Sequence, residues 1–429
     1  MNLKLVNHAS LLIEAGNVRI LTDPWPSGKI FDNGWSLIEE SNLPEDHEYN
    51  YVWVSHEHPD HFTPWVFALK RIKSNKKILL QKRDDDHKLK NFFLSKGHEV
   101  IEITNDGIEV EGVMIKGGTN KSFDSWLSTT FNDITILNLN DCVAFHSKEE
   151  IQDIKNIVGN IDVLATQFSF ANWTGNIGDN ELPMKARKET FRSLKDIFDV
   201  LQPKEIIPFA NFSYFSHEEN HYLNKNSISI RNLIDEFPNE TFHVLRKLDT
   251  WSKDTTNKEN DMRCLYWENK TKHAMSKEKT KTNTVQLEEL FSEFYKMKTS
   301  LLVRNNLGRL RNELIWHQAY SSSSIYLQDL DVSIDYNIFE DIKVIKKDKS
   351  DCDVSMSSES LYNVMKNMWG FGTLMINGRF QANYKTFNNF VLQTRLYYMN
   401  NIGKFFPKNV TVRDIKNSNS LVKQLLELE

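Results

Sequence analysis

Four residues of types that commonly bind metal ions lie within six positions of one another, in the segment YVWVSHEHPDHFTP: His56, His58, Asp60 and His61. An extended backbone would direct the rings of His56 and His58 to the same side, because they are two positions apart. Pro59 forces a turn, after which the next two residues can return to the same cavity. Imidazole and carboxylate groups are ligands that zinc, iron and manganese accept. Two such pairs suit two adjacent ions, and Asp60 is also a candidate to orient or deprotonate a metal-bound water.

The motif follows an apolar strand, and the first quarter of the chain is predicted to consist of short strands joined by tight turns. The turn Ala15-Gly16-Asn17 is typical of a hairpin. The predicted strands are residues 3–7, 10–16, 18–25 and 50–56. Helices and strands then alternate, which predicts two sheets sandwiched between helices. The predicted helices are residues 64–74, 87–97, 147–160 and 185–203, and the strands between and after them are residues 77–82, 99–103, 108–118, 124–141, 161–169 and 205–212.

The composition changes near residue 250. Two stretches rich in polar residues, 252–261 and 269–284, flank the strand-like segment RCLYWE (263–268). The second stretch is typical of a solvated linker. We therefore predict a metal-binding domain over residues 1–268, a linker over 269–284, and a smaller C-terminal α+β domain over 285–429.

The pattern His-x-His-x-Asp-His after an apolar strand, together with the opening NHASLLIEAGNVRILTDPW, resembles the metallo-β-lactamase superfamily. The resemblance implies an αββα sandwich with metal ions at the edge of its two sheets. It also implies that Asp141, at the end of the strand-like ITILNLND, occupies the position of the bridging carboxylate. A turn-forming role for Asp141 is the alternative, and Asn140 is a neighbouring candidate.

Five further residues are candidates for additional metal or substrate contacts, each with a structural alternative. His8 precedes the first hairpin and is a candidate for substrate contact or for capping. The late strand has no histidine where superfamily hydrolases have one, but His217 and His221 follow it and would share a helix face. Solvated surface histidines are their alternative, as for His146 at a helix start. Trp173 is a candidate for the pocket floor or for the core.

A narrower resemblance comes from TDPWPSGKIFDNGWSLIEE ahead of the motif and from the later NLNDC and IIPFANFSYF. These segments are similar to the catalytic part of the CMP-N-acetylneuraminate hydroxylase family. The resemblance implies iron-dependent oxygenation of a sugar nucleotide or a similar polar metabolite, with Asp32 and Trp35 in the pocket wall. That family carries a Rieske iron–sulfur domain. The sequence lacks its Cys-x-His…Cys-x-x-His pair, so we expect this domain to be absent and electrons to come from a separate protein.

Two other classes of function remain open. A hydrolase of phosphodiester, amide or lactone bonds would use a metal to lower the pKa of a bound water. A binding protein without catalysis is disfavoured, because four ligand-type residues are costly to bury for no purpose. The expected cofactor is iron or zinc, as one or two ions, since both metals accept these ligands.

The overall composition excludes several partners. Lys and Arg number 53 against 58 Asp and Glu, for a formal net charge of −5, which argues against nucleic acid. No uncharged apolar run approaches the ~18 residues of a membrane span. The three cysteines are widely separated and odd in number, which fits a reducing compartment. We expect a cytoplasmic protein that acts on a small molecule.

Overall fold

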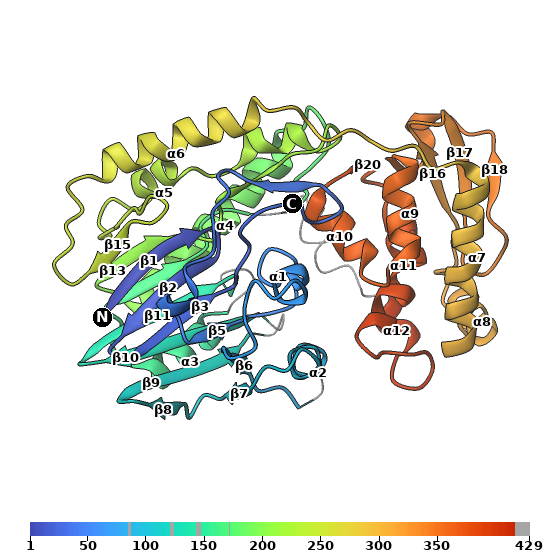
Figure 1. Cartoon of the computed structure of the whole chain (residues 1–429). Helices are drawn as coiled ribbons and strands as arrows, with labels where there is room; N and C mark the ends of the chain where they lie inside the picture. Colours follow the sequence, from blue (N-terminus) through green and yellow to red (C-terminus); the bar gives the residue numbers. More distant parts are fainter. Residues whose placement is uncertain (85–86, 121–123, 143–146, 171, 417–429) are drawn as a thin grey trace.

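The computed structural model describes residues 1–84, 87–120, 124–142, 147–170 and 172–416. Its larger, N-terminal part contains two sheets that pack face to face, with helices on their outer faces, and its C-terminal part contains a further sheet with helices beside it (Figure 1). The predicted architecture, a sandwich of two sheets between helices followed by a smaller α+β unit, is therefore confirmed.

The first sheet contains seven strands and carries the metal-ligand motif. In spatial order they are β15 (Thr250–Ser252), β1 (Asn2–Asn7), β2 (Ser10–Ala15), β3 (Val18–Thr22), β5 (Tyr51–Trp53), β6 (Lys77–Gln81) and β7 (Val100–Ile103). The strands β1, β2 and β3 form antiparallel hairpins, and β3, β5, β6 and β7 run parallel. The predicted turn is present, with Ala15 paired to Val18 and Gly16 in the left-handed region at φ 58°.

The second sheet contains six strands. In spatial order they are β13 (Glu205–Pro208), β12 (Val163–Thr166), β11 (Ile134–Asn140), β10 (Ser125–Phe131), β9 (Val113–Thr119) and β8 (Ile108–Val110). The strands β11, β12 and β13 are parallel, so their carboxyl ends meet at one edge. Short elements accompany the two sheets: β4 (Trp35–Leu37), β14 (Ser213–Phe215), η1 (Asp46–Glu48), η2 (His221–Asn226) and α5 (Ile230–Glu236).

Alternation along the strands assigns their side chains to separate cores. In β2, Leu11 and Ile13 pack in the core shared by both sheets, whereas Leu12 faces the outer helices together with Phe67 and Phe93. This is the period of two expected for strands buried on both faces. The helices of this part are α1 (Pro64–Ala68), α2 (Lys88–Ser95), α3 (Lys148–Val158) and α4 (Glu181–Leu201).

One predicted strand is wrong. Residues 263–268 lie inside the helix α6 (Asn260–Met275). Its buried residues Cys264, Trp267 and Ala274 recur at helical spacing, and Trp267 stacks on Phe212 with 3.8 Å between ring centroids. The apolar run was too short to distinguish a strand from the buried side of a helix. The first seven residues of the predicted linker 269–284 form the end of α6, while the domain boundary itself stays a prediction.

The C-terminal part contains a five-stranded sheet covered by helices (Figure 1). In spatial order its strands are β18 (Lys343–Ile345), β17 (Val332–Tyr336), β16 (Ser323–Leu327), β19 (Val354–Met356) and β20 (Phe380–Ala382). Its helices are α7 (Leu287–Arg304), α8 (Leu307–Trp316), η3 (Lys349–Asp351), α9 (Ser358–Lys366), α10 (Gly370–Asn377), α11 (Asn388–Asn401) and α12 (Val412–Lys416). Within the described ranges, no helix is long and apolar enough to cross a membrane.

The core of the C-terminal part also includes side chains from the N-terminal part. Phe31, Trp35, Trp173, Phe215 and Leu223 are buried in the same apolar cluster as the C-terminal strands and helices. The two parts therefore share a core rather than meeting only through a linker.

Candidate metal centre

The candidate ligands gather where strands end. Asp23 follows β3, His56 and His58 follow the neighbouring parallel strand β5, and Asp141 follows β11 of the other sheet. Carboxyl ends of parallel strands meet at one sheet edge, so residues far apart in the sequence reach one place. The structure thus brings the motif and the predicted bridging carboxylate together.

The first group of candidate ligands contains His56, His58 and Asp141, whose ligand atoms all lie within 4.8 Å of one another. The His56 Nε2 atom lies 2.8 Å from His58 Nδ1 and 4.0 Å from an Asp141 carboxylate oxygen. His56 is buried and His58 is exposed, so this group opens toward solvent.

The second group contains His8, Asp60 and His61, all three of them buried. The Asp60 Oδ2 atom lies 3.6 Å from His8 Nε2 and 3.3 Å from His61 Nε2. His61 Nε2 also lies 3.2 Å from the Asp141 carboxylate. Asp141 therefore stands between the two groups, as a bridging ligand would.

His8 lies beside the end of the late strand where the sequence offers no histidine. Its carbonyl oxygen accepts a hydrogen bond of 2.9 Å from the backbone N–H of Ala210, two residues beyond β13. His8 has a left-handed backbone at φ 31°. Such a conformation is uncommon for a non-glycine residue and persists where the surroundings fix it. His8, which follows the first strand, thereby places its imidazole ring on the side of the site where the late strand has no histidine.

Asp23 orients His61. The Asp23 carboxylate is fully buried and lies 3.0 Å from His61 Nδ1, and it accepts hydrogen bonds from the backbone N–H and the hydroxyl of Ser55 and from the Asn140 amide. A carboxylate on one ring nitrogen fixes the tautomer and turns the other nitrogen toward a metal. Burial lowers the pKa of His61, but Asp141 and Asp60 outweigh it and hold that pKa well above its ordinary value.

The chemistry of the site fits a metal ion. Buried polar atoms are normally hydrogen-bonded. Among the described residues, several atoms of the two groups are buried and have no hydrogen-bond partner: both ring nitrogens of His8, Asp60 Oδ1, His61 Nε2 and Asp141 Oδ1. Ligands of one ion lie at about 2.0–2.2 Å from it and hence within about 4.4 Å of each other, close to the spacing of each group.

Asp124 is a site residue that the sequence analysis missed. It precedes β10, and its Oδ1 atom lies 3.7 Å from His56 Nε2. Burial, reinforced by the nearby Asp141, raises the pKa of Asp124 to about 6. Residues 113–125 contain no histidine. The available signal was a carboxylate in the same place, since iron and zinc accept either group.

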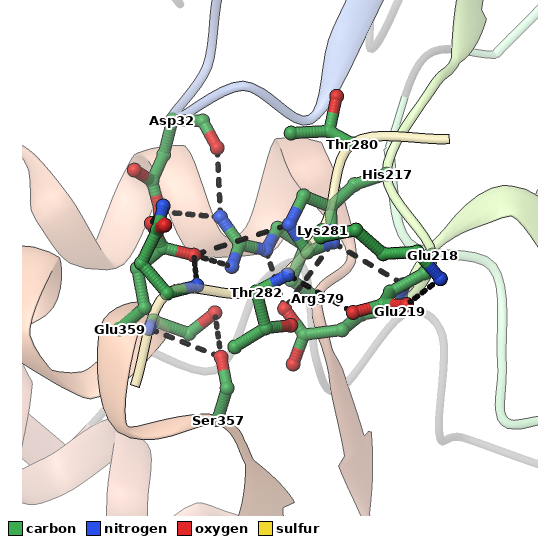
Figure 2. Close-up of polar contacts among 12 residues, drawn as sticks. Asp32, His217, Glu218, Glu219, Thr280, Lys281, Thr282, Ser357, Glu359 and Arg379 are labelled. Atoms are coloured by element: carbon green, nitrogen blue, oxygen red, sulfur yellow. Dashed lines mark hydrogen bonds and ion pairs between the residues drawn. The ribbon is translucent and has the colours of Figure 1, made fainter. Parts of the chain in front are cut away.

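The other candidates lie elsewhere. His217 is buried beside Glu219 and Glu359 of a separate polar cluster (Figure 2), and the His221 ring meets the carbonyl of Met275. They do not share a helix face, because η2 begins only at His221. Neither belongs to the two candidate ligand groups of the described residues. The tight turns here follow from hydrogen bonds of Asn220 and Asn224, which a helix prediction could not anticipate.

Trp173 was predicted for the pocket floor or the core, Asp32 and Trp35 for the pocket wall, and His146 for a ligand or a surface position. Trp173 is fully buried and stacks on Phe380 with ring centroids 4.8 Å apart, so it is a core residue, as its structural alternative predicted. Trp35 is likewise buried, and Asp32 forms an ion pair with Arg379. His146 lies outside the described residues.

Comparison with known proteins agrees with this architecture. The family described as the β-lactamase superfamily domain matches residues 2–168. The cytidine monophosphate-N-acetylneuraminic acid hydroxylase of Danio rerio is 23% identical over an alignment of 248 residues that covers 52% of this chain and 40% of that protein. A human relative named as an inactive form of the hydroxylase is 20% identical over 58% of this chain and 51% of its own length. The chain thus matches about half or less of the length of these relatives.

Two solved structures are similar at low identity. The diiron β-hydroxylase CmlA from Streptomyces venezuelae has a TM-score of 0.41 and 15% identity, covering 58% of this chain and 53% of its own. The isothiocyanate hydrolase from Delia radicum gut bacteria has a TM-score of 0.41 and 16% identity, covering 59% and 99%. Residues 2–168, which hold most of the strands and the motif described above, are thus similar to the β-lactamase superfamily domain, and this match covers less than half of the chain.

Proposed function

We propose that the chain is an iron-dependent oxygenase that hydroxylates a sugar nucleotide or a similar polar metabolite. One observation carries the proposal: each group of candidate ligands consists of two histidines and one carboxylate. This ligand set, with positions left open for oxygen and substrate, is typical of non-haem iron(II) oxygenases. The likeness to sialic-acid nucleotide hydroxylases supports the same reading and suggests the substrate class.

In this proposal His56, His58 and Asp141 hold one ion, His8, Asp60 and His61 hold the second, and Asp141 faces both. Asp124 is a further ligand candidate on the His56 side. Bound iron would supply the redox chemistry with molecular oxygen. Hydroxylation of a C–H bond by O₂ also consumes two electrons and two protons and releases water, so a separate electron-transfer protein is proposed as a partner.

The chain's own residues prepare this site. Asp23 holds the His61 ring with Nε2 directed inward, and Ser55 and Asn140 hold Asp23. All three residues of the second group are buried, while the exposed His58 lies where a substrate would approach. Asp60 lies between His8 and His61, so in a metal-activated hydrolysis it is also the carboxylate best placed to orient a water.

The test is metal analysis of protein purified anaerobically without chelator. Iron at one to two ions per chain, lost in His56→Ala and reduced by about one ion in His8→Ala, is expected. His221→Ala is the matched control and should keep its metal, because that ring lies outside both groups. Stoichiometric zinc without iron would instead favour the hydrolase, and full metal retention in a His56→Ala/His61→Ala double variant would contradict the site.

A further inference from the structure

A fully buried arginine joins the C-terminal part to the metal-binding part. Arg379, just before β20, donates hydrogen bonds from Nε to Glu219 at 2.6 Å, from Nη2 to Glu359 at 2.6 Å, and from Nη1 to the backbone and side-chain oxygens of Asp32 at 2.7 and 2.9 Å (Figure 2). Its side chain has no exposed area. The guanidinium is therefore fixed by three carboxylates at once.

These carboxylates belong to three different segments of the chain. Asp32 lies in the loop between β3 and β4, Glu219 lies between β14 and η2, and Glu359 lies in the first turn of α9. The first two segments belong to the metal-binding part. Three negative carboxylates surround one positive guanidinium. Burial, with a smaller contribution from Glu359 and Glu219, raises the pKa of Asp32 to about 6 although Arg379 lowers it. Such an arrangement is weak evidence for stability and better evidence for a fixed geometry.

The loop that carries Asp32 is held in a strained conformation. Phe31, Asp32 and Asn33 all have left-handed backbones, with φ of 48°, 56° and 57°. Single residues of this kind cost about 1–2 kcal/mol each, so three in succession need strong support from their surroundings.

That support comes largely from the C-terminal part. The Asn377 amide donates to the Phe31 carbonyl, and the Asn220 amide donates both to the Gly34 carbonyl and to the Asn377 carbonyl. The Asn363 amide donates to the Asp32 carboxylate. The loop therefore lies between the two parts and is shaped by contacts from both.

The same loop contacts the candidate metal centre. The Phe31 ring lies 6.3 Å from the His58 ring, edge to face at 62°, and Phe31 is only 4% exposed. His58 is the exposed residue of the first group, and besides the 2.8 Å contact of its Nδ1 with His56 Nε2, its ring lies against Phe31. Phe31 is thus the link between the Arg379 cluster and the ligand.

We infer that Arg379 is a positioning residue for the metal centre, which acts by fixing Asp32 and thereby holding Phe31 against His58. The inference rests on the proposed metal-dependent function. It assigns a role to the C-terminal part, which holds the loop whose Phe31 ring packs against the exposed ligand His58. Loss of a hydrogen-bonded outer contact typically changes metal affinity about 10–100-fold, and for a ring-edge contact such as Phe31–His58 we expect the lower end of that range.

The experiment compares Co²⁺ affinity and the Co²⁺ absorption spectrum with thermal stability in the full chain. Asp32→Ala releases the loop yet leaves Arg379 with two carboxylates, and Phe31→Leu removes the ring edge while keeping the cluster. Both should bind Co²⁺ roughly 10-fold more weakly, with an altered spectrum. Asn305→Ala is the control, because it removes buried hydrogen bonds to Asn400 and Phe406 away from the loop. It should lower the melting temperature but keep the affinity.

The outcomes separate the two proposals. Wild-type Co²⁺ affinity and spectrum in both loop variants would overturn the role of Arg379 alone, provided that His56→Ala loses Co²⁺. If wild type binds no Co²⁺, or if His56→Ala binds it normally, the proposed metal centre fails and the role of Arg379 falls with it. Arg379→Lys offers a further check, since lysine cannot form the three-way fork and should restore little of the affinity lost in Arg379→Met.

Discussion

At the scale of single residues, the candidate centre depends on side chains that do not themselves face a metal. Asp23 is fully buried, and its contacts with Ser55, His61 and Asn140 account for its whole carboxylate. It lies in the sequence as part of an Asp-Pro pair at the end of a hairpin. Its position beside His61 makes it the residue that fixes which ring nitrogen points inward.

Replacing Asp23 with asparagine tests this role. The side chain keeps its size, but the ring loses its carboxylate partner and the preferred tautomer. We expect metal affinity to fall about 10–100-fold, measured by competition with a chromophoric chelator. Asp353→Asn is the matched control, since Asp353 is also buried and hydrogen-bonded but lies in the C-terminal part, directly before β19. Equal losses in both variants would contradict a specific role for Asp23.

A second residue-scale prediction concerns Asp32, which faces Arg379, Glu219 and Glu359. Burial raises its pKa from 3.8 to about 6 in the folded protein, so between these pH values the folded state binds more protons than the unfolded state. Its contribution to the free energy of unfolding must therefore fall as pH rises from about 4 to 6. Asp32→Asn lacks this contribution. In urea unfolding of the metal-free protein, the free energy of unfolding of wild type should fall by roughly 1–2 kcal/mol relative to that of Asp32→Asn between pH 4.5 and pH 7.

If the difference in free energy of unfolding between wild type and Asp32→Asn stays the same across that pH range, the raised pKa is contradicted. A difference of opposite sign would mean that the ion pair with Arg379 outweighs burial at Asp32.

At the scale of elements, strand ends place the ligands and one loop adjusts them. The parallel strands β3 and β5 bring Asp23 and the histidine motif together, whereas the loop before β4 carries Phe31, whose ring lies beside His58. Gly34 shows how closely this loop is packed. A Cβ atom at Gly34 would lie 2.6 Å from Asn377 Cβ and 2.9 Å from the Phe31 carbonyl oxygen.

Gly34→Ala should therefore destabilise the protein by about 1–3 kcal/mol, because neither neighbour can move without disturbing the loop. Gly308→Ala in α8 is the control, where the nearest atom is 3.9 Å away and alanine should stabilise the helix by about 0.5–1 kcal/mol. Chemical denaturation of both variants gives the comparison. A neutral Gly34→Ala would show that the loop has room to relax.

At the scale of the whole molecule, the C-terminal part is built into the metal-binding part. Trp173 stacks on Phe380, its backbone N–H donates to the Met375 carbonyl, and Phe31 and Leu223 are buried in the C-terminal core. Fixed contacts of this extent join the two parts into one unit, although the chain order suggests two.

A chain that ends at residue 284 should consequently fold poorly. Its Phe31, Trp35 and Trp173 side chains would be uncovered, and Asp32 and Glu219 would lose Arg379. Stronger binding of an apolar dye and a melting temperature lower by about 10 °C or more are expected, since these losses amount to several kcal/mol. A truncated chain with the wild-type melting temperature and metal content would show that the N-terminal part is independent.

The sequence by itself was enough to predict the sandwich and the motif. Alternating apolar residues specify strands, a glycine specifies the first hairpin, and histidines two positions apart after a strand predict a metal site, because all three signals are local. The strand predicted at 263–268 failed for the same reason, since a six-residue apolar run does not distinguish a strand from the buried side of a helix.

Only the tertiary structure decided which distant residues meet. His8 follows β1 and Asp124 precedes β10, and both positions lie at the sheet edges where the motif is found. Asp23 reaches His61 because β3 pairs with β5. Arg379 lies more than 300 positions from Asp32, and no local pattern indicates their pairing. Spacing along the chain determines local geometry, whereas contacts between strand ends, loops and shared cores depend on packing of the whole chain.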